Sequence, residues 1–344
     1  MTWCIYSGTE ENWQKHFLKC KNHYRQSFHW GEYKSMMNWK ILRLEKIDAI
    51  GKKTLVQITY KKKFFFCAAY IPGDIAGDIN QLDKSLKKKI LEVTNSKFLY
   101  IRLDSNNIYY EKESYIFKKN KWHKPWHREH VSKSIDCNIN VDTDNIIKRS
   151  SEDWKKNYKR SLNKFRNNDL NIQITNKPNV KDLVLISTIM NKNKKIFVPH
   201  TQKEFIHLSE NLSQNTLFAI VYSSDGVPLA YRGMVYYDDR AWDIGAATTG
   251  KGRNLLVSYY LTIELIKKCK SLGINNYNFG AIDELNKPGV YHFKKGIGQN
   301  EFKYTGEWEW SNLILLRFII NIIIKILMSD KLRKIIPFIN NLKF

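Results

Sequence analysis

Short runs of branched and aromatic side chains alternate with stretches of helical periodicity through the first hundred residues. The runs have the length of β-strands, which predicts strands at 39–44, 55–60, 63–70 and 98–103. Residues 81–93 place Leu82, Leu86 and Ile90 on one side of a helix and lysines largely on the other. Helices are also predicted at 10–24 and 27–37. The first part of the chain is therefore predicted to be an α/β unit.

The same alternation returns after residue 150. The pattern predicts a cationic helix from Ser151, helices at 180–191, 202–211 and 254–271, and strands at 217–222, 229–237 and 241–246. Asp225 and Gly226 stand between two of these strands, as turn residues of an antiparallel meander do. We therefore expect an α/β protein with domains at 1–148 and 149–305, followed by a hydrophobic and basic helical tail at 306–344.

The chain is strongly basic. Its 344 residues include 57 Lys and Arg against 33 Asp and Glu, a net charge of +24 that is spread along the sequence. A folded protein with this balance carries a broad positive field, so an anionic partner is expected. Nucleic acid, a pyrophosphate-linked substrate and an anionic membrane all satisfy that expectation, and charge alone does not choose between them.

The cysteine and histidine spacings predict neither a disulfide framework nor a metal site. The five cysteines are isolated and form no C-x-x-C pair, which is typical of a protein of the reducing cytosol. His123, His127 and His130 lie close in sequence, but Pro125 prevents the helical spacing that a metal site would need. The first residues lack the cationic start and apolar run of a signal peptide, so a cytoplasmic location is expected.

A glycine-rich turn lies between the last strand of the predicted meander and the next helix. Gly250 and Gly252 would let backbone N–H groups approach an anion, with the cation of Arg253 beside them. Residues 245–252 nearly spell the P-loop of nucleotide triphosphatases. Gly252, however, takes the place of the hydroxyl residue that holds magnesium, so that activity is not expected.

Two segments near the end of the second domain carry a family resemblance. After the meander, glycine turn and helix, residues 273–280 end in Tyr-Asn-Phe-Gly, and residues 293–298 read Phe-Lys-Lys-Gly-Ile-Gly. These segments resemble the FemABX peptidoglycan aminoacyltransferases and the related BioF-like acetyltransferase domain. Similar residues upstream extend the resemblance over most of 26–305; they are 26–30 with Lys34, 70–72, 101–104, and 159–160 with Lys164.

The resemblance implies tandem GNAT-like acyltransferase domains, each with a mixed, largely antiparallel sheet flanked by helices. Such enzymes transfer an amino acid from aminoacyl-tRNA, or an acyl group from acyl-CoA, to an amine or hydroxyl of a nucleotide- or lipid-linked envelope glycan or peptidoglycan precursor. They use neither a metal nor a covalent enzyme intermediate, so no bound cofactor is expected. Asn278, Ala281 and Ile297 depart from the usual family residues and leave the acceptor open. A non-catalytic tRNA- or membrane-binding protein is the competing interpretation.

The resemblance also implies roles for individual residues. Lys294 would stabilise the oxyanion of the tetrahedral intermediate, and a strand at 291–295 would point Phe293 into the core and Lys294 toward the substrate. Asp104 would receive a proton from the attacking amine or orient it. Lys34 would bind the pyrophosphate of the acceptor. The structural alternatives are exposed lysines and, for Asp104, a cap at the end of a strand.

Other cations are candidates for binding anions. Arg160 and Lys164 lie on the cationic helix that begins at Ser151, and they could contact tRNA or simply face solvent. Lys203 is a candidate for phosphate binding within residues 198–205, where the arginine usual in the family has no clear counterpart.

The tail contains an aliphatic helix with a regular polar stripe. Residues 313–328 are almost wholly aliphatic except for Arg317, Asn321 and Lys325, which recur every four residues. Sixteen residues are too few to span a bilayer comfortably. The helix could lie in the headgroup plane of an anionic membrane, helped by Lys331, Arg333 and Lys334, or it could be a buried terminal helix.

Overall fold

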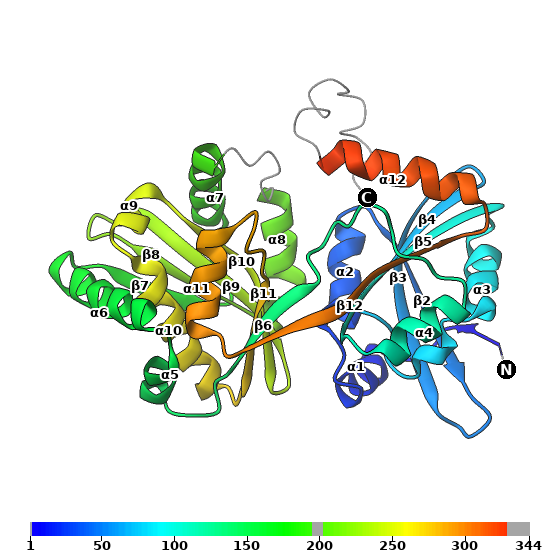
Figure 1. Cartoon of the computed structure of the whole chain (residues 1–344), viewed down its shortest axis with the longest axis horizontal. Helices are drawn as coiled ribbons and strands as arrows, with labels where there is room; N and C mark the ends of the chain where they lie inside the picture. The colour runs from blue at the N-terminus through cyan, green and yellow to red at the C-terminus, as the bar shows by residue number, and fades with distance from the viewer. Residues whose placement is uncertain (1, 195–201, 329–344) are drawn as a thin grey trace. The chain divides into compact units, whose positions relative to one another are not determined.

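The computed structural model describes residues 2–194 and 202–328 (Figure 1). It confirms a mixed α/β fold, in which the chain divides into two compact units. The N-terminal unit comprises residues 1–132 together with 303–344, and the C-terminal unit comprises 133–302. The basic residues Lys331, Arg333 and Lys334 lie outside the described residues.

The N-terminal unit contains one six-stranded sheet with the order β1-β2-β3-β4-β5-β12. Its strands are β1 (Cys4–Ile5), β2 (Lys40–Ile47), β3 (Lys53–Lys63), β4 (Phe66–Pro72), β5 (Phe98–Ile108) and β12 (Asn300–Ser311). Neighbouring strands are antiparallel except β4 and β5, which run parallel and are joined through α3 (Lys84–Thr94). The other helices of the unit are α1 (Glu10–Lys19), α2 (Phe28–Met36), α4 (Glu111–Lys119) and α12 (Ile314–Met328).

The C-terminal unit repeats this plan, with the order β7-β8-β9-β10-β11-β6. Its strands are β6 (Lys133–Asn138), β7 (Asn171–Thr175), β8 (Thr216–Tyr222), β9 (Pro228–Tyr237), β10 (Arg240–Thr248) and β11 (Asn276–Ala281). Again only one neighbouring pair, β10 and β11, is parallel. The helices are α5 (Thr143–Arg149), α6 (Glu152–Asn167), α7 (Val180–Lys194), α8 (Gln202–Asn211), α9 (Gly250–Asn254), α10 (Val257–Ser271) and α11 (Pro288–Ile297). The two units are therefore tandem copies of one topology.

Local sequence explains most of these elements. The side chain of Asp83 caps α3 by accepting from the amides of Ser85 and Leu86, and α3 is followed by Asn95, whose φ of 45° is left-handed. Leu86 and Ile90 are completely buried in the N-terminal core. Ser151 caps α6 in the same way, through the amide of Trp154.

The observed division differs from the boundaries expected at 148 and 305. Strand β6 pairs with β11, which assigns residues 133–148 to the C-terminal unit. Strand β12 pairs with β5, so residues 306–311 are part of the N-terminal sheet rather than of a helical tail. Both differences have one cause, because the sixth strand of each unit pairs with a strand that is far from it in the sequence.

Two expected elements were wrong in type or continuity. Residues 291–295 do not form a strand but belong to α11, where Pro288 occupies the first turn, in which a missing N–H is harmless. The single helix expected at 254–271 is broken into α9 and α10 at Leu256, whose φ is 58°. None of the helices within the described residues combines the length and hydropathy that crossing a bilayer requires.

Candidate active site

The parallel strands β10 and β11 separate after only three paired positions. Their register runs from Arg240 opposite Asn276 to Trp242 opposite Asn278, and then ends. Just beyond, Gly280 has a φ of 71°, a left-handed conformation that favours glycine. A Cβ at this position would lie 3.7 Å from the carbonyl oxygen of Asp243 and 3.9 Å from Nζ of Lys294. The ammonium group of Lys294 therefore lies beside the backbone at the point where β10 and β11 separate.

A buried ion pair lies close to the point where β10 and β11 separate. Arg232 of β9 and Asp243 of β10 are 3.0 Å apart, and both side chains are almost completely buried. The hydroxyl of Tyr277 on β11 donates to the other carboxylate oxygen of Asp243 at 3.2 Å. Burial raises the pKa of Tyr277 well above its usual value, so this hydroxyl keeps its proton. Three neighbouring strands are thus connected through one carboxylate.

Lys294 is placed by α11. Its Nζ donates to the carbonyl oxygen of Ala281 at 2.9 Å, at the end of β11. Burial lowers the pKa of Lys294 to about 8, and the nearby carboxylate of Asp243 offsets only part of that effect. The charges of Arg232 and Lys287 lower the pKa further. At neutral pH the side chain is still mainly an ammonium, but it is a more acidic one than a surface lysine.

Aromatic rings fix the other side of α11. The ring centroid of Phe293 lies 5.1 Å from that of Tyr259 and 6.2 Å from that of Trp154. The guanidinium carbon of Arg232 lies 5.3 Å from the Phe293 centroid and 5.7 Å from that of Phe279. Phe293 therefore packs against the C-terminal core while the adjacent Lys294 reaches β11. This division comes from a helix, where neighbours are about 100° apart, rather than from an alternating strand.

Asn278 holds the turn that Gly280 makes. Its side-chain oxygen accepts from the amide of Gly280 at 2.8 Å and from the hydroxyl of Ser134 at 3.1 Å. Its side-chain nitrogen donates to Asp136 on β6. An aspartate at this position could not donate that last bond and would lie beside a second carboxylate. Asn278 departs from the usual family residue, and its side-chain amide suits the hydrogen bond to Asp136 on β6.

The model of the FemAB family matches residues 141–316, just over half of the chain. The chain belongs to the FemAB family. The match includes the separated strands, the ion pair of Arg232 and Asp243, and Lys294. No curated protein matches the sequence of this FemAB-family protein with significance.

Several solved structures share the fold. The structure of FemX superimposes with a TM-score of 0.77 at 13% identity, covering 93% of this chain and all of FemX. The L-PGS structure from Bacillus licheniformis gives a TM-score of 0.53 at 11% identity, covering 91% of this chain and 95% of that one. A tandem GNAT protein from the clavulanic acid biosynthesis pathway gives 0.53 at 5% identity, covering 90% and 98%. These similarities establish the tandem GNAT-like fold of the FemAB-family protein.

The glycine turn has a structural explanation in the FemAB-family protein. Helix α9 has only five residues, and the hydroxyl of Thr249 already accepts from the amide of Gly252 at 3.1 Å. A Cβ on Gly252 would lie 2.7 Å from the backbone oxygen of Leu229, whereas Gly250 faces open space. Gly252 is therefore required by close packing against β9. Arg253 is exposed beside it, and its role in phosphate binding stays a prediction.

The remaining cations of the C-terminal unit differ in exposure. Nζ of Lys164 donates to the backbone oxygen of Asn254, which ties α6 to the end of α9. Arg160 on α6 and Lys203 on α8 are exposed. Lys164 thus has a structural partner, while Arg160 and Lys203 present their charges to solvent.

Lys34 and Asp104 both belong to the N-terminal unit. Nζ of Lys34 lies 5.2 Å from the ring centroid of Trp30, in the range of a cation–π interaction. Asp104 is buried on β5 and forms an ion pair of 3.1 Å with Arg25. The same Arg25 donates to the hydroxyl of Tyr70 at 3.1 Å. The structure therefore shows Asp104 as the partner of a buried guanidinium, and its role as a base stays a prediction.

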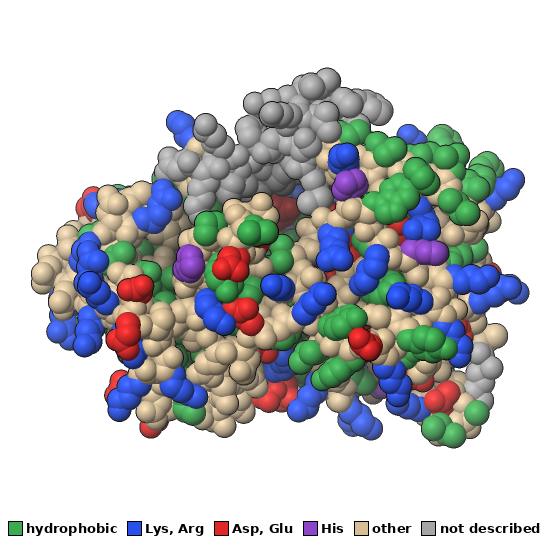
Figure 2. Space-filling model, in the orientation of Figure 1, with side chains coloured by type: hydrophobic (Ala, Val, Ile, Leu, Met, Phe, Trp, Pro, Cys, Tyr) green, Lys and Arg blue, Asp and Glu red, His purple; other side chains and the backbone are tan. Residues whose placement is uncertain are grey.

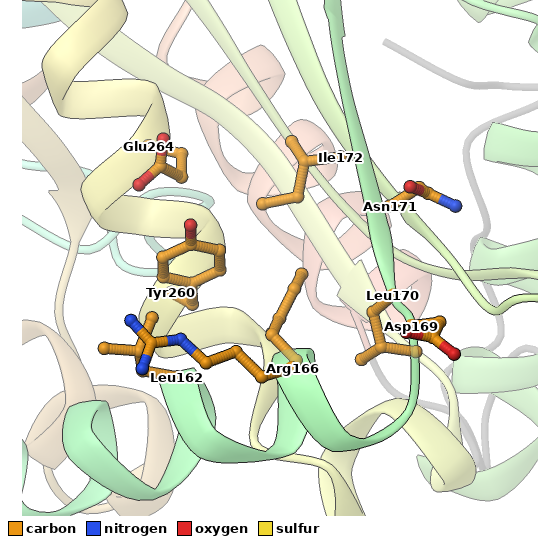
Figure 3. A pocket seen from close by; sticks show the side chains of 9 residues that line it. Leu162, Arg166, Asp169, Leu170, Asn171, Ile172, Tyr260 and Glu264 are labelled. Atoms are coloured by element: carbon orange, nitrogen blue, oxygen red, sulfur yellow. The ribbon is translucent and has the colours of Figure 1, made fainter.

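A separate pocket opens between α6, β7 and α10, with a volume of about 490 Å³ (Figure 3). Leu162 and Ile172 contribute apolar side chains, and Arg166, Asp169 and Glu264 contribute charges of both signs. No candidate site residue lines it. Within the described residues there is also no group of three or more His, Cys, Asp or Glu side chains arranged to hold a metal ion.

Sequence reasoning found Lys294 and Phe293 but missed Arg232, Asp243 and Tyr277. A signal was present, because Arg232 is the single charged residue of β9, and Asp243 lies between the apolar residues Trp242 and Ile244 within β10. Such residues are rarely buried without a partner. Which charge pairs with which could not be derived without the order of β9, β10 and β11.

Proposed function

We propose that this FemAB-family protein is an acyltransferase that transfers an aminoacyl group from aminoacyl-tRNA to an amine or hydroxyl of a cell-envelope glycan or peptidoglycan precursor. Family membership supports the transfer chemistry, and the fold shared with FemX and L-PGS supports the aminoacyl donor. The observation that carries the proposal is the ammonium of Lys294 at the separated ends of β10 and β11.

The proposed reaction needs little from the protein beyond position and charge. The acceptor nitrogen or oxygen attacks the ester carbonyl carbon of the donor, and a tetrahedral oxyanion forms. The C–O bond to the ribose then breaks, the hydroxyl of tRNA leaves with a proton, and the acceptor loses its own proton. A fixed cation beside the oxyanion lowers the barrier by about 3–4 kcal/mol. Lys294 supplies that cation without a covalent enzyme intermediate.

The low pKa of Lys294 suits this role. An ammonium removed from bulk water interacts more strongly with a developing negative charge than a solvated one does. The group remains mainly charged at neutral pH because its pKa is about 8. The buried pair of Arg232 and Asp243 ties β9 to β10, and the hydroxyl of Tyr277 extends this connection to β11, so the site is held rigidly.

The surface charge fits a polyanionic donor. Helix α6 exposes Arg160 and Arg166, and it also carries Lys155, Lys156 and Lys159. In Figure 2, Lys and Arg side chains gather where Figure 1 draws α6. A basic helix face of this kind can follow a phosphate backbone.

An acyl-CoA donor is the second candidate. The tandem GNAT protein from the clavulanic acid biosynthesis pathway, whose structure is a form without AcCoA, shares the fold over 90% of this chain. In this version the leaving group is a thiol rather than a ribose hydroxyl, and the acceptor is a sugar amine of a polysaccharide precursor. The role of Lys294 is the same in both versions.

A transfer assay with an envelope extract tests the proposal and separates the donors. The protein is incubated with labelled aminoacyl-tRNA or labelled acetyl-CoA, with and without nuclease. Lys294→Ala should lower turnover about 10²- to 10³-fold. The neighbouring Lys295→Ala is the matched control and should remain near the wild-type rate, because Lys295 is paired with Glu301 on the surface. Equal rates in wild type and Lys294→Ala would refute the proposed role, and binding of tRNA with no transfer would favour a non-catalytic protein.

The pH dependence of kcat/KM separates the charged role from that of a base. If the ammonium is required, the rate should fall as pH rises through about 8, because Lys294 loses its proton there. Lys294→Arg should shift that fall to much higher pH, since a guanidinium stays protonated. A rate that instead rises through pH 8 in wild type, and loses this rise in Lys294→Arg, would identify Lys294 as a base.

A further inference from the structure

Helix α12 packs with Arg317 and Asn321 of its polar stripe facing inward. Nε of Arg317 lies 3.0 Å from a carboxylate oxygen of Glu309, and Nδ2 of Asn321 donates to the other oxygen at 2.7 Å. The side-chain oxygen of Asn321 accepts from the amides of Trp126 and His127 at 3.1 and 3.2 Å. Glu309 and Asn321 are completely buried. The helix is therefore held to the N-terminal unit by polar residues that its sequence would place in water, together with Ile320 and Ile324, which are buried against Tyr100.

The consequence is an exposed apolar face. Five large side chains of α12 are each between 44% and 72% exposed: Ile314, Leu315, Phe318, Ile319 and Ile322. Their spacing places them on one stripe of the helix. Single exposed apolar residues are common, but a contiguous stripe of this size marks an interaction surface.

Aromatic residues of the same unit extend this face. Trp126 is half-exposed and packs edge-on against Phe318, with 4.2 Å between ring centroids. Phe64 and Phe65 are strongly exposed at the turn between β3 and β4. The backbone of Lys97 joins that turn to the start of α12, since its amide donates to Phe65 and its carbonyl accepts from Asn312. We call these exposed side chains the apolar platform; it comprises Phe64, Phe65, Trp126, Ile314, Leu315, Phe318, Ile319 and Ile322.

The sequence segments that form the apolar platform carry charges of one sign. The segments that form it, at 61–66, 97–100, 123–128 and 313–328, contain lysines and arginines but no Asp or Glu. Lys62, Lys63, Lys97, Arg128 and Lys325 are exposed. Figure 2 shows hydrophobic side chains where Figure 1 draws α12, with Lys and Arg side chains around them. The sequence after α12 adds Lys331, Arg333 and Lys334 against the single Asp330.

We propose that the apolar platform is a docking surface for an anionic lipid membrane. Aliphatic and aromatic side chains enter the boundary between headgroups and acyl chains, while the surrounding lysines bind acidic headgroups. Each lysine close to an anionic surface strengthens binding by about fivefold. The arrangement lies on the membrane without spanning it, in agreement with the lengths of the described helices.

The charge pattern disfavours a second copy of the chain as the occupant. In a two-fold dimer the platform would meet itself, so its basic surroundings would face an identical set of cations. An anionic bilayer complements both the apolar centre and the positive surroundings. This inference does not depend on the proposed transfer reaction, because every residue of the platform belongs to the N-terminal unit and none is a candidate catalytic residue.

Sedimentation of the full-length protein with vesicles tests the proposal. We expect binding to vesicles of phosphatidylcholine and phosphatidylglycerol, and much weaker binding to phosphatidylcholine alone. The double variant Leu315→Glu with Phe318→Glu should reduce partitioning by about tenfold or more. Lys63→Glu with Lys97→Glu should remove most of the preference for anionic vesicles.

A matched control separates the platform from the general effect of added charge. Ile50→Glu with Leu285→Glu makes the same change at two highly exposed apolar residues outside the platform, and it should bind vesicles nearly as well as wild type. Circular dichroism melting of each variant checks that the fold is retained. No binding of wild type to anionic vesicles, or equal losses in the platform and control variants, would overturn the proposal. So would a wild-type dimer that the platform variant dissociates while vesicle binding stays unchanged.

Discussion

Replacing Lys294 by methionine should stabilise the protein at neutral pH. In the native state burial lowers the pKa of Lys294 to about 8 from its ordinary 10.5, which means that the fold disfavours the ammonium. A difference of this size corresponds to about 3 kcal/mol when the group is fully protonated in both states. Because the side chain is partly exposed, solvent screening reduces the expected gain for Lys294→Met to about 1–2 kcal/mol.

The sign of the pH dependence follows from proton binding in the two states. Below pH 8 Lys294 is protonated whether the chain is folded or unfolded, and the whole penalty is present. Between pH 8 and about 10.5 the unfolded chain still binds the proton while the native state has lost it, so wild-type stability rises relative to the variant. The advantage of Lys294→Met should therefore be largest below pH 8 and should vanish near pH 10.5.

Urea unfolding of wild type and variant at pH 7 and pH 10 measures this difference. The lost hydrogen bond to Ala281 should cost little, since that residue is exposed and water can replace the ammonium. Lys295→Met is the control on the same helix, and it should bring no gain because the Lys295 side chain is about half-exposed and paired with Glu301. A gap between wild type and Lys294→Met that is independent of pH, or a variant less stable at pH 7, would refute the reasoning.

Two further substitutions test how the structure is held together. Gly252→Ala should destabilise the protein by about 1–3 kcal/mol in a thermal or urea melt, because its Cβ would meet the backbone of Leu229. The control Gly250→Ala should be neutral or slightly stabilising. Equal effects of the two substitutions on stability would contradict the packing argument. Asn321→Ala should lower the free energy of unfolding by about 1–3 kcal/mol, because it leaves buried polar groups without partners. The control Lys325→Ala, at an exposed position one turn further along α12, should change stability by less than about 0.5 kcal/mol. An unaffected melting temperature for Asn321→Ala would mean that α12 is not held as described.

The site was predictable where a short segment carries its own geometry. The Tyr-Asn-Phe-Gly segment ends a buried strand in a glycine that must turn. The Phe-Lys-Lys-Gly-Ile-Gly segment, which contains Lys294, follows soon after it. The order of residues within these short segments was enough to identify them as candidates. It was not enough to place Lys294 on a helix, because residues 291–295 fit both periods and only Pro288 signalled the first turn of α11.

The ion pair and the hydrogen bond that lie near Lys294 could not be predicted in the same way. Arg232, Asp243 and Tyr277 lie on three strands, and their meeting depends on β10 pairing with β9 on one side and β11 on the other. The spacing of these residues in the sequence does not reveal the order of the strands in the sheet. Strand β12 was missed for a related reason, since its partner β5 precedes it by some two hundred residues.

Helix α12 marks the limit of sequence reasoning most clearly. Its polar stripe, which includes Arg317 and Asn321, correctly predicted a helix but left open whether these residues face lipid headgroups or belong to a buried terminal helix. The structure turns them inward, because Glu309 is buried on β12 and needs charged and hydrogen-bonding partners.

By itself the amino-acid sequence determined the periodicity of most elements, the basic character of the surface and the segments that carry the family resemblance, since these depend on residues close together in the chain. Only the tertiary structure decided which strand completes each sheet, which charges are buried together and which face of α12 is exposed. Those outcomes depend on pairing between distant segments, such as the buried carboxylate of Glu309 on β12 with Arg317 and Asn321 on α12.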